Sequence, residues 1–400
     1  MLLSVFSIQG TAFLSQFILA GLLPTESFSI VRTVEATIQM ISAVAPWGMS
    51  LLVIRLASQN VASNELRRLF TTYVMFAGTA ALFIASLGFL IVLCRHVRME
   101  GYLSVLIWII VLTSLSRTSL NYYYGKEQFG LIATITFIIS IISLVMLVFF
   151  TSKWHLDGWI FSRYLTEIIV LIAALYFVKS NLTLKFLTIA ESKNVLIEGM
   201  AVSLSLIFRS AIDNFPFLIF AYLSVNQTEI AMYGLCTLLI SGAMIFPSSI
   251  ISVLLPRYGN LQKNQPQELI NVHTRYERYV LLSSLVVMLL LVALVFCSPY
   301  YLENQKYNGI FPYLMLAATI VPIRAYTTLN ANVLFVNRQT AIGTKINFAC
   351  AMICGLLSYS LYIAYGLWGI IIASLSTEIA TLIIFKSYSK QINQQISKVA

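Results

Sequence analysis

The amino-acid sequence predicts an all-α polytopic membrane protein with about twelve transmembrane helices in two six-helix lobes. Hydrophobic residues make up 59% of the 400-residue chain and charged residues only 10%, which is too few to surround a water-soluble core with a polar shell. Apolar runs of about 20 residues, the length that crosses a bilayer, follow one another along the whole chain. Polar residues also recur at matching places in the two halves.

Each half of the chain contains six apolar runs separated by short polar loops. The first six predicted spans are residues 2–22, 28–57, 70–94, 102–124, 128–150 and 158–178. The second six are residues 198–222, 229–255, 277–298, 309–335, 341–363 and 366–385. The second, eighth and tenth runs exceed the minimum length, which predicts that these helices tilt or extend beyond the bilayer.

Basic residues predict the orientation in the membrane. With a cytoplasmic N-terminus, sixteen lysines and arginines fall in cytoplasmic loops and five in outer loops. The positive-inside rule therefore predicts that both termini are cytoplasmic, as an even number of spans requires. The net charge of +10 is explained by these short loops and does not indicate binding of nucleic acid.

An internal repeat relates the two halves. The matched motifs lie 202 to 211 residues apart and in the same order. They include SLLVIR at 50–55 with SVLLPR at 252–257, TSLN at 118–121 with TTLN at 327–330, and Gly158 with Gly369. Six spans per unit return the chain to its starting side, so the repeat is parallel. It predicts lobes at residues 1–180 and 198–388, a cytoplasmic linker at 181–197 and a cytoplasmic tail at 389–400.

Several stretches carry a family resemblance. They are LAGLLPTESFSIVRTVEA (19–36), MSLLVIRLAS (49–58), NYYYGKEQFG (121–130), the segment from Asp213 to NQTEIAMYGL (226–235), and PRYGNL (256–261). With them the chain resembles the multidrug/oligosaccharidyl-lipid/polysaccharide (MOP) exporter superfamily, and within it the Wzx-type flippases of O-antigen or polysaccharide repeat units. The first basic residue is Arg32 and the spans number twelve rather than fourteen, and both departures argue against lipid II as substrate.

The resemblance implies an architecture and a substrate. The two lobes would enclose a V-shaped cavity of the MATE type that opens alternately to each side of a bacterial inner membrane. The substrate would be an oligosaccharide on a polyprenyl diphosphate, whose lipid tail stays in the bilayer. Polymerase and chain-length proteins of the same pathway would be partners, without any cofactor apart from a proton or sodium gradient.

Ionisable residues inside the predicted spans are candidates for the site, because each costs roughly 2.5 to 3.5 kcal/mol on insertion scales. They are Arg32, Glu35, Arg117, Arg163, Glu167, Arg209, Asp213, Arg324 and Glu378. Helical spacing allows Arg32 to pair with Glu35, Arg163 with Glu167 and Arg209 with Asp213. Arg117 and Arg324 have no acidic residue within one helical turn.

Two interpretations of these charges remain open. In the functional one, Arg209, Arg117 and Arg324, with Arg32 near the outer mouth, bind the diphosphate through bidentate hydrogen bonds. Asp213, Glu167, Glu35 or Glu378 would then bind a coupling proton or sodium ion, and Asp213 would hold Arg209 until substrate or protonation releases it. In the structural one, Arg117 pairs with Glu167 and Arg324 with Glu378 inside each lobe.

Three function classes compete. We expect a transporter rather than an enzyme, because the sequence shows no Walker A loop, nucleophile elbow or zinc-ligand spacing, and His96, His155 and His273 fall in or beside predicted loops. A drug antiporter of the same fold would need a net acidic cavity for cationic substrates. Among the charged residues inside the predicted spans, however, basic residues outnumber acidic ones. A membrane glycosyltransferase, ligase or polymerase would need a longer outer loop.

Overall fold

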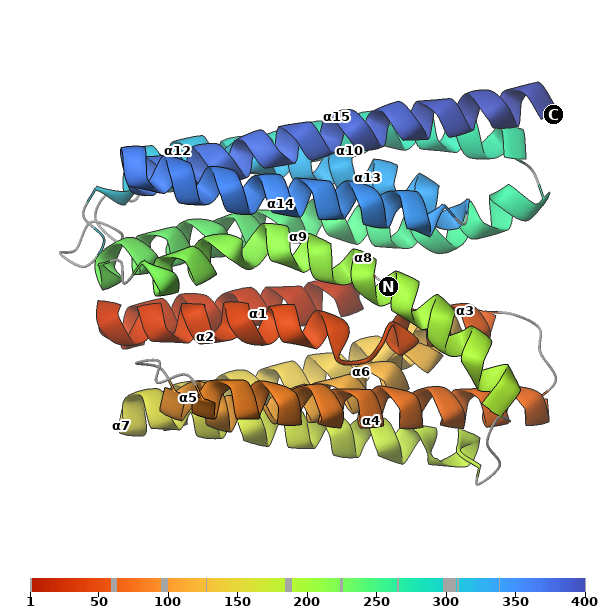
Figure 1. Ribbon diagram of the computed structural model, residues 1–400, viewed down its shortest axis with the longest axis horizontal. Helices are drawn as coiled ribbons and strands as arrows, with labels where there is room; N and C mark the ends of the chain where they lie inside the picture. Colours follow the sequence, from red (N-terminus) through yellow and green to blue (C-terminus); the bar gives the residue numbers. More distant parts are fainter. Residues whose placement is uncertain are drawn as a thin grey trace. The chain divides into compact units, whose positions relative to one another are not determined.

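The structure is a computed structural model that describes residues 2–58, 63–94, 100–126, 128–183, 189–223, 226–264, 266–297, 307, 309–337 and 339–399. Regular structure within these residues is helical (Figure 1). The helices are α1 (Leu2–Leu22), α2 (Thr25–Val44), α3 (Met49–Ser58), α4 (Ser63–Cys94), α5 (Glu100–Leu106), α6 (Ile109–Gly125), α7 (Phe129–Val178), η1 (Lys179–Asn181), α8 (Ile189–Tyr222), α9 (Gln227–Asn264), α10 (Pro266–Cys297), α12 (Ile310–Ala318), α13 (Ile320–Val336), α14 (Thr340–Tyr365) and α15 (Leu367–Val399).

The twelve predicted spans coincide with these helices. Three spans are each built from two consecutive helices, α2 with α3, α5 with α6, and α12 with α13. The fifth and sixth spans form the single element α7, whose direction changes at His155, where φ is 49° and ψ is −121°. In the described part of the chain, nine segments are long and apolar enough to cross a membrane, and one of them, Gly130–Val178, is 49 residues long, enough for two crossings.

The repeat is visible in the backbone. A Cβ atom added at Gly158 would overlap the carbonyl group of Phe150, and one added at Gly369 would overlap that of Leu361. In both cases the glycine lies eight residues after the carbonyl that it meets. The same tight approach therefore occurs at the junction between the fifth and sixth spans and between the eleventh and twelfth, which agrees with the sequence match of Gly158 with Gly369.

Contacts divide the chain into two compact units. The N-terminal unit contains Gly21–Leu23 and Ile30–Ser210, and the C-terminal unit contains Met1–Ala20, Pro24–Ser29 and Ala211–Ala400. In the N-terminal unit α3, α4 and α7 pack against α6. In the C-terminal unit α9, α10 and α15 pack against α13, and α14 packs along α15 (Figure 1). The lobe boundaries drawn from the sequence stay a prediction.

A break near Pro46 interrupts the second span. The helix stops after Val44, and Trp47 and Gly48 both have positive φ, 49° and 71°. A side chain at Gly48 would collide with the backbone of Gly199 on α8, so glycine is required here for both its conformation and its size. The indole Nε1 of Trp47 donates a hydrogen bond of 3.2 Å to the carbonyl of Leu196, which fixes the break against α8.

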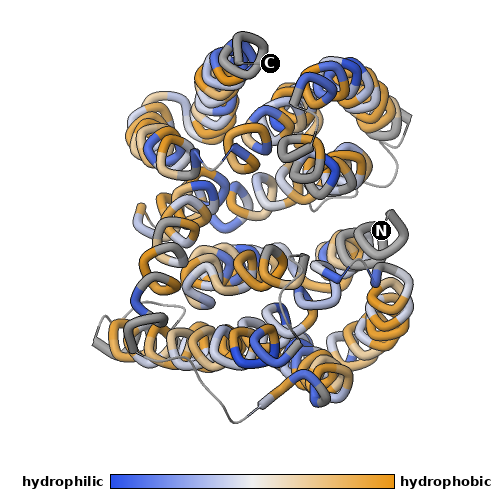
Figure 2. Tube along the Cα trace, turned by 90° about the vertical axis from the view of Figure 1, so that its right-hand side faces the viewer, coloured by the Kyte–Doolittle hydropathy of each residue, from blue (hydrophilic) through white to orange (hydrophobic). Residues whose placement is uncertain are grey.

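Exposed side chains on the outer helices are predominantly large and apolar. Phe83 on α4, Tyr176 on α7, Leu289 on α10 and Leu356 on α14 are more than half exposed. Figure 2 shows the same composition as hydrophobic residues along the helices, interrupted by short hydrophilic stretches. Surfaces of this kind are suited to lipid rather than water, which agrees with a multi-pass membrane protein.

Candidate functional site

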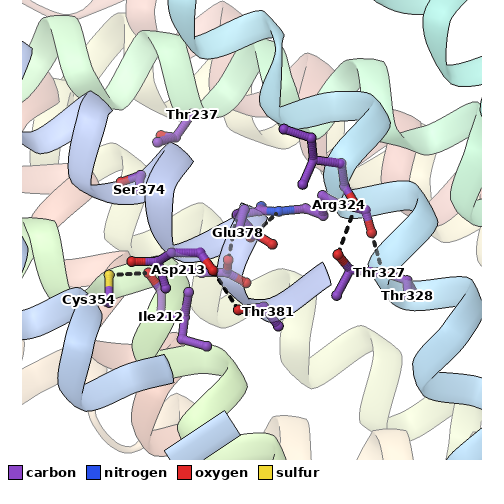
Figure 3. Close-up of polar contacts among 12 residues, drawn as sticks. Ile212, Asp213, Thr237, Arg324, Thr327, Thr328, Cys354, Ser374, Glu378 and Thr381 are labelled. Atoms are coloured by element: carbon purple, nitrogen blue, oxygen red, sulfur yellow. Dashed lines mark hydrogen bonds and ion pairs between the residues drawn. The ribbon is translucent and has the colours of Figure 1, made fainter. Parts of the chain in front are cut away.

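Three charged residues from three helices meet in the C-terminal unit, and they define the charged cluster. Arg324 on α13 places its Nη2 atom 2.7 Å from Oδ1 of Asp213 on α8 and 2.8 Å from Oε1 of Glu378 on α15. Its Nε also donates a hydrogen bond of 2.9 Å to the same Glu378 oxygen. Figure 3 shows the three side chains pointing toward one another. One guanidinium thus connects helices that are far apart in the sequence.

Burial differs sharply within the charged cluster. The side chain of Glu378 is 1% exposed, that of Arg324 is 23% exposed and that of Asp213 is 35% exposed. Glu378 therefore depends on Arg324 for its stability as a carboxylate, because a buried charge without a partner is costly. Asp213 is the accessible member. With one cation and two carboxylates, the cluster has a formal charge of −1 when all three groups are ionised.

Polar groups that surround the charged cluster are hydrogen-bonded within their helices or to neighbours. The hydroxyl oxygens of Tyr233 and Ser374 lie 3.3 Å apart, and the thiol of Cys354 donates to the carbonyl of Ile212 at 3.6 Å. Thr381 donates to the carbonyl of Thr377, one turn earlier on α15. Figure 3 shows Ser374, Cys354, Ile212 and Thr381 around the three charges. They give this part of the bundle a polar interior.

The N-terminal unit holds a second set of charges, on α6 and α7. Nη2 of Arg163 lies 3.8 Å from Oε1 of Glu167, as the i,i+4 spacing predicts. Arg117 on α6 lies close enough to both for their charges to act on it electrostatically. Arg117 is also the single exposed residue of α6; the other sixteen are buried or half-buried. The predicted pairing of Arg117 with Glu167 stays a prediction.

The remaining candidates lie on α2 and α8. Nη1 of Arg32 lies 3.9 Å from Oε2 of Glu35, which confirms the predicted i,i+3 pair, and both side chains are 12% exposed. Arg209 is half-buried on α8, one turn before Asp213. The structure thus brings Arg324 together with Glu378, as the lobe-internal interpretation predicted. The functional roles proposed for these residues stay predictions.

Sequence reasoning missed two features. It did not foresee the Asp213–Arg324 contact, because these residues are more than a hundred positions apart and no local spacing indicates it. The placement of His273 in or beside a loop was wrong, since α10 begins at Pro266 and His273 is buried on it. The signal that was available is the i,i+4 spacing of His273 and Glu277, which puts both on one helix face.

The charged cluster offers ion-pair and proton-transfer chemistry. Among the described residues, no group of three or more histidine, cysteine, aspartate or glutamate side chains is arranged to hold a metal ion. Carboxylates in general can pair with arginine or bind a proton or a monovalent cation, whereas an arginine stays charged. Asp213 is the more accessible of the two carboxylates of the charged cluster, and its role in ion coupling stays a prediction.

Comparison with solved structures identifies the fold. The chain matches an inward-facing multidrug resistance MATE family transporter of the MOP superfamily with a TM-score of 0.73 and 11% identity over 100% of both chains. It matches a MATE protein in the straight conformation with a TM-score of 0.75 and 12% identity, over 99% of this chain and 95% of that one. A MOP superfamily transporter from Pyrococcus furiosus, described as having a binding pocket of reverse polarity, matches with a TM-score of 0.65 and 12% identity over 99% and 94% of the chains.

Comparisons of sequence find no match, either among protein-family models or among curated proteins. The likeness therefore lies in the fold, at an identity of 11 to 12% for the three structures described. The full-length coverage includes both halves of the chain. The chain has the fold of the MATE transporters of the MOP superfamily.

Proposed function

We propose that this protein is a transporter of the bacterial inner membrane that moves polyprenyl-diphosphate-linked oligosaccharide repeat units from the inner to the outer leaflet by alternating access. The product would supply O-antigen or capsule synthesis, together with a polymerase and chain-length proteins. The observation that carries the proposal is the exposure of Arg117 on α6. The MATE fold supports transport as the general activity, and the charges support the substrate class.

Arg117 lies well inside its span. The apolar segment is Gly101–Gly125, so Arg117 is four residues from its centre, or about 6 Å along a helix with a rise of 1.5 Å per residue. At this depth an arginine that faced lipid would cost roughly 2.5 to 3.5 kcal/mol on insertion scales. Helix α6 is packed against α3, α4 and α7, and Arg117 lies deep among protein atoms while it keeps accessible surface. This combination supports a polar path for an anion within the protein rather than contact with lipid.

The charge distribution favours an anionic substrate on the N-terminal unit. Among the membrane charges considered from the sequence, this unit contains Arg32, Arg117, Arg163 and Arg209 against Glu35 and Glu167, four positive against two negative charges. A diphosphate carries negative charge that must leave water. Arginine binds it with a planar pair of N–H donors and cannot lose its proton at the membrane interior.

A cation-coupled small-molecule antiporter is the second candidate, and one observation favours it. The charged cluster in the C-terminal unit has two carboxylates for one arginine, which suits a proton or sodium ion better than a phosphate. Both activities are compatible in one protein if the cation drives the movement of the anionic substrate. We propose a proton or sodium gradient as the driving force.

Substitution of Arg117 tests the function. We expect Arg117→Ala and Arg117→Gln to abolish or strongly reduce surface polysaccharide at equal protein level, and Arg117→Lys to retain part of it, because lysine keeps the charge but not the fork. Arg163→Gln is the comparison within the same unit, and it should reduce export less than Arg117→Gln, since Arg163 already has Glu167 as a partner on α7. Lipid-linked repeat units should accumulate on the cytoplasmic leaflet.

Two results would contradict the proposal. Normal polysaccharide export by both uncharged Arg117 variants would remove the diphosphate role of this residue. A deletion strain that exports polysaccharide normally but becomes sensitive to small cationic compounds would favour the antiporter. In that case the charged cluster, and not Arg117, would be the part of the protein that the substrate uses.

A further inference from the structure

A second polar network, partly buried, lies in the C-terminal unit, and it is made of side chains that the charged cluster does not use. Nε2 of His273 lies 3.5 Å from Oε1 of Glu277 on α10. The hydroxyl of Tyr326 on α13 donates a hydrogen bond of 2.8 Å to the same oxygen. Nδ1 of His273 lies 3.1 Å from the hydroxyl of Tyr258 on α9. We call these four residues the histidine network.

Burial makes the histidine network costly to maintain. His273 is 2% exposed and Tyr258 is 0% exposed, so neither side chain can exchange its polar partners for bulk water. Leucine or phenylalanine at these positions would fill a helix interface without such a requirement. The network nevertheless connects an imidazole, a carboxylate and two phenol groups from three helices through consecutive polar contacts.

The geometry allows two protonation states. When the imidazole is neutral with its proton on Nε2, that N–H points to Glu277 and Nδ1 accepts a hydrogen bond from Tyr258. When a second proton binds, Nδ1 becomes a donor to the oxygen of Tyr258, and Glu277 faces a full positive charge. His273 and Tyr326 therefore compete for the same oxygen of Glu277. The protonation state of the imidazole determines which of the two contacts with that oxygen is stronger.

Other groups that act on the histidine network lie on α15 and α10. On α15, Nζ of Lys386 lies over the ring of Tyr326, 5.1 Å from its centroid, and its charge acts on Glu277. Tyr276 on α10 acts electrostatically on Tyr258. Helix α12, which also packs against α10, has no charged residue in its sequence. With Lys386 positive and Glu277 negative, a proton on His273 changes the local formal charge from 0 to +1.

We propose that His273 and Glu277 form a proton-binding site, and that a proton bound there acts on α13 through Tyr326. Protonation draws the Glu277 carboxylate toward the imidazolium and weakens its hydrogen bond from Tyr326. Tyr326 is two residues after Arg324 on α13. A weaker hydrogen bond from Tyr326 to Glu277 therefore loosens the same helix that carries Arg324 of the charged cluster. The site goes beyond the proposed function and does not depend on which substrate is moved.

Nuclear magnetic resonance of the purified protein in nanodiscs, without substrate, tests the site. Tyrosines labelled with ¹³C at Cζ report the hydrogen bonding of their hydroxyls, and the difference from Tyr326→Phe assigns the signal of Tyr326. Between pH 5 and 8 we expect this signal to move in the wild type. It should stay fixed with pH in His273→Gln and in Glu277→Gln, because each removes one partner of the competition.

Control variants keep the result interpretable. His155→Asn changes a histidine outside the network, at the positive φ of α7, and should retain the pH response of Tyr326. Tyr258→Phe keeps the ring of Tyr258 and removes its hydroxyl, so it serves if His273→Gln does not fold, and it should alter the response. A Tyr326 signal that ignores pH in the wild type, or that responds equally in His273→Gln, would overturn the proposal without bearing on Arg117 or on transport.

Discussion

Loss of the Arg324 guanidinium is the perturbation whose effect follows most directly from the structure. In Arg324→Gln, the carboxylate of Glu378 loses both of its contacts with the guanidinium, at 2.8 and 2.9 Å, while its side chain is 1% exposed. Removal of one partner from a buried ion pair typically costs about 3–5 kcal/mol, because the remaining charge has no solvent to stabilise it. We expect Arg324→Gln to be strongly destabilising.

The size of the effect on thermal stability can be worked out. Unfolding entropy is about 2.1 cal/mol/K per residue in globular proteins, which gives about 0.8 kcal/mol/K for a chain of this length. A loss of about 3–5 kcal/mol then lowers the Tm by about 4–6 °C. Asp213→Asn should lower it by less than about 1 °C, because Asp213 is 35% exposed and solvent-screened pairs contribute little.

The double variant Arg324→Gln with Glu378→Gln separates the charge from the packing. It replaces a buried carboxylate that has lost its contacts with the guanidinium by a neutral amide, so it should recover part of the Tm lost in Arg324→Gln, whereas independent sites would lose stability additively. Thermal unfolding in detergent at pH 7.5, followed by tryptophan fluorescence, gives the three values. Equal Tm values for wild type and Arg324→Gln, or additive losses in the double variant, would refute the reasoning.

Two further predictions concern backbone approach and alkaline pH. The variants Gly158→Ala and Gly369→Ala should each lower the free energy of unfolding by about 1–3 kcal/mol through overpacking, because the new Cβ atom meets backbone atoms. The control is Gly101→Ala, which should leave the Tm unchanged or raise it slightly, because nothing lies within 4 Å of a Cβ atom there. Burial raises the pKa of Tyr307 to about 12, against about 10 in an unfolded chain. Its stabilisation is therefore complete below pH of about 10 and lost as the pH rises toward 12, so Tyr307→Phe should show a smaller fall in Tm over that range.

The fold was predictable because its determinants are local or periodic. Length of apolar run, position of basic residues and the spacing of repeated motifs gave the twelve spans and the parallel repeat, and the helices follow them. The breaks inside spans were harder. The break in the second span lies next to a proline, Pro46, but nothing in an apolar stretch such as residues 102–124 indicates that α5 ends at Leu106 and α6 begins at Ile109.

The site was predictable only where the pairing is local or repeated. Helical spacing found Arg32 with Glu35, and the repeat suggested Arg324 with Glu378; both contacts exist. Asp213 reaches Arg324 across helices, and such a contact depends on packing that the sequence does not encode locally. The error on His273 came from the predicted start of the ninth span at residue 277, eleven residues after α10 begins.

Arg117 and Arg324 are neighbours in the repeat but differ in their surroundings, and this difference distinguishes a substrate contact from a structural one. The alignment of TSLN with TTLN places Arg117 opposite Tyr326, and Arg324 opposite Leu115. Arg324 contacts the buried Glu378 directly, whereas Arg117 keeps accessible surface and acts on the buried Glu167 through its charge, so Arg117→Gln should lower the Tm by less than Arg324→Gln does and still lose transport. An Arg117→Gln variant as unstable as Arg324→Gln would show that Arg117 holds the N-terminal unit together, and its effect on transport would then say nothing about phosphate binding.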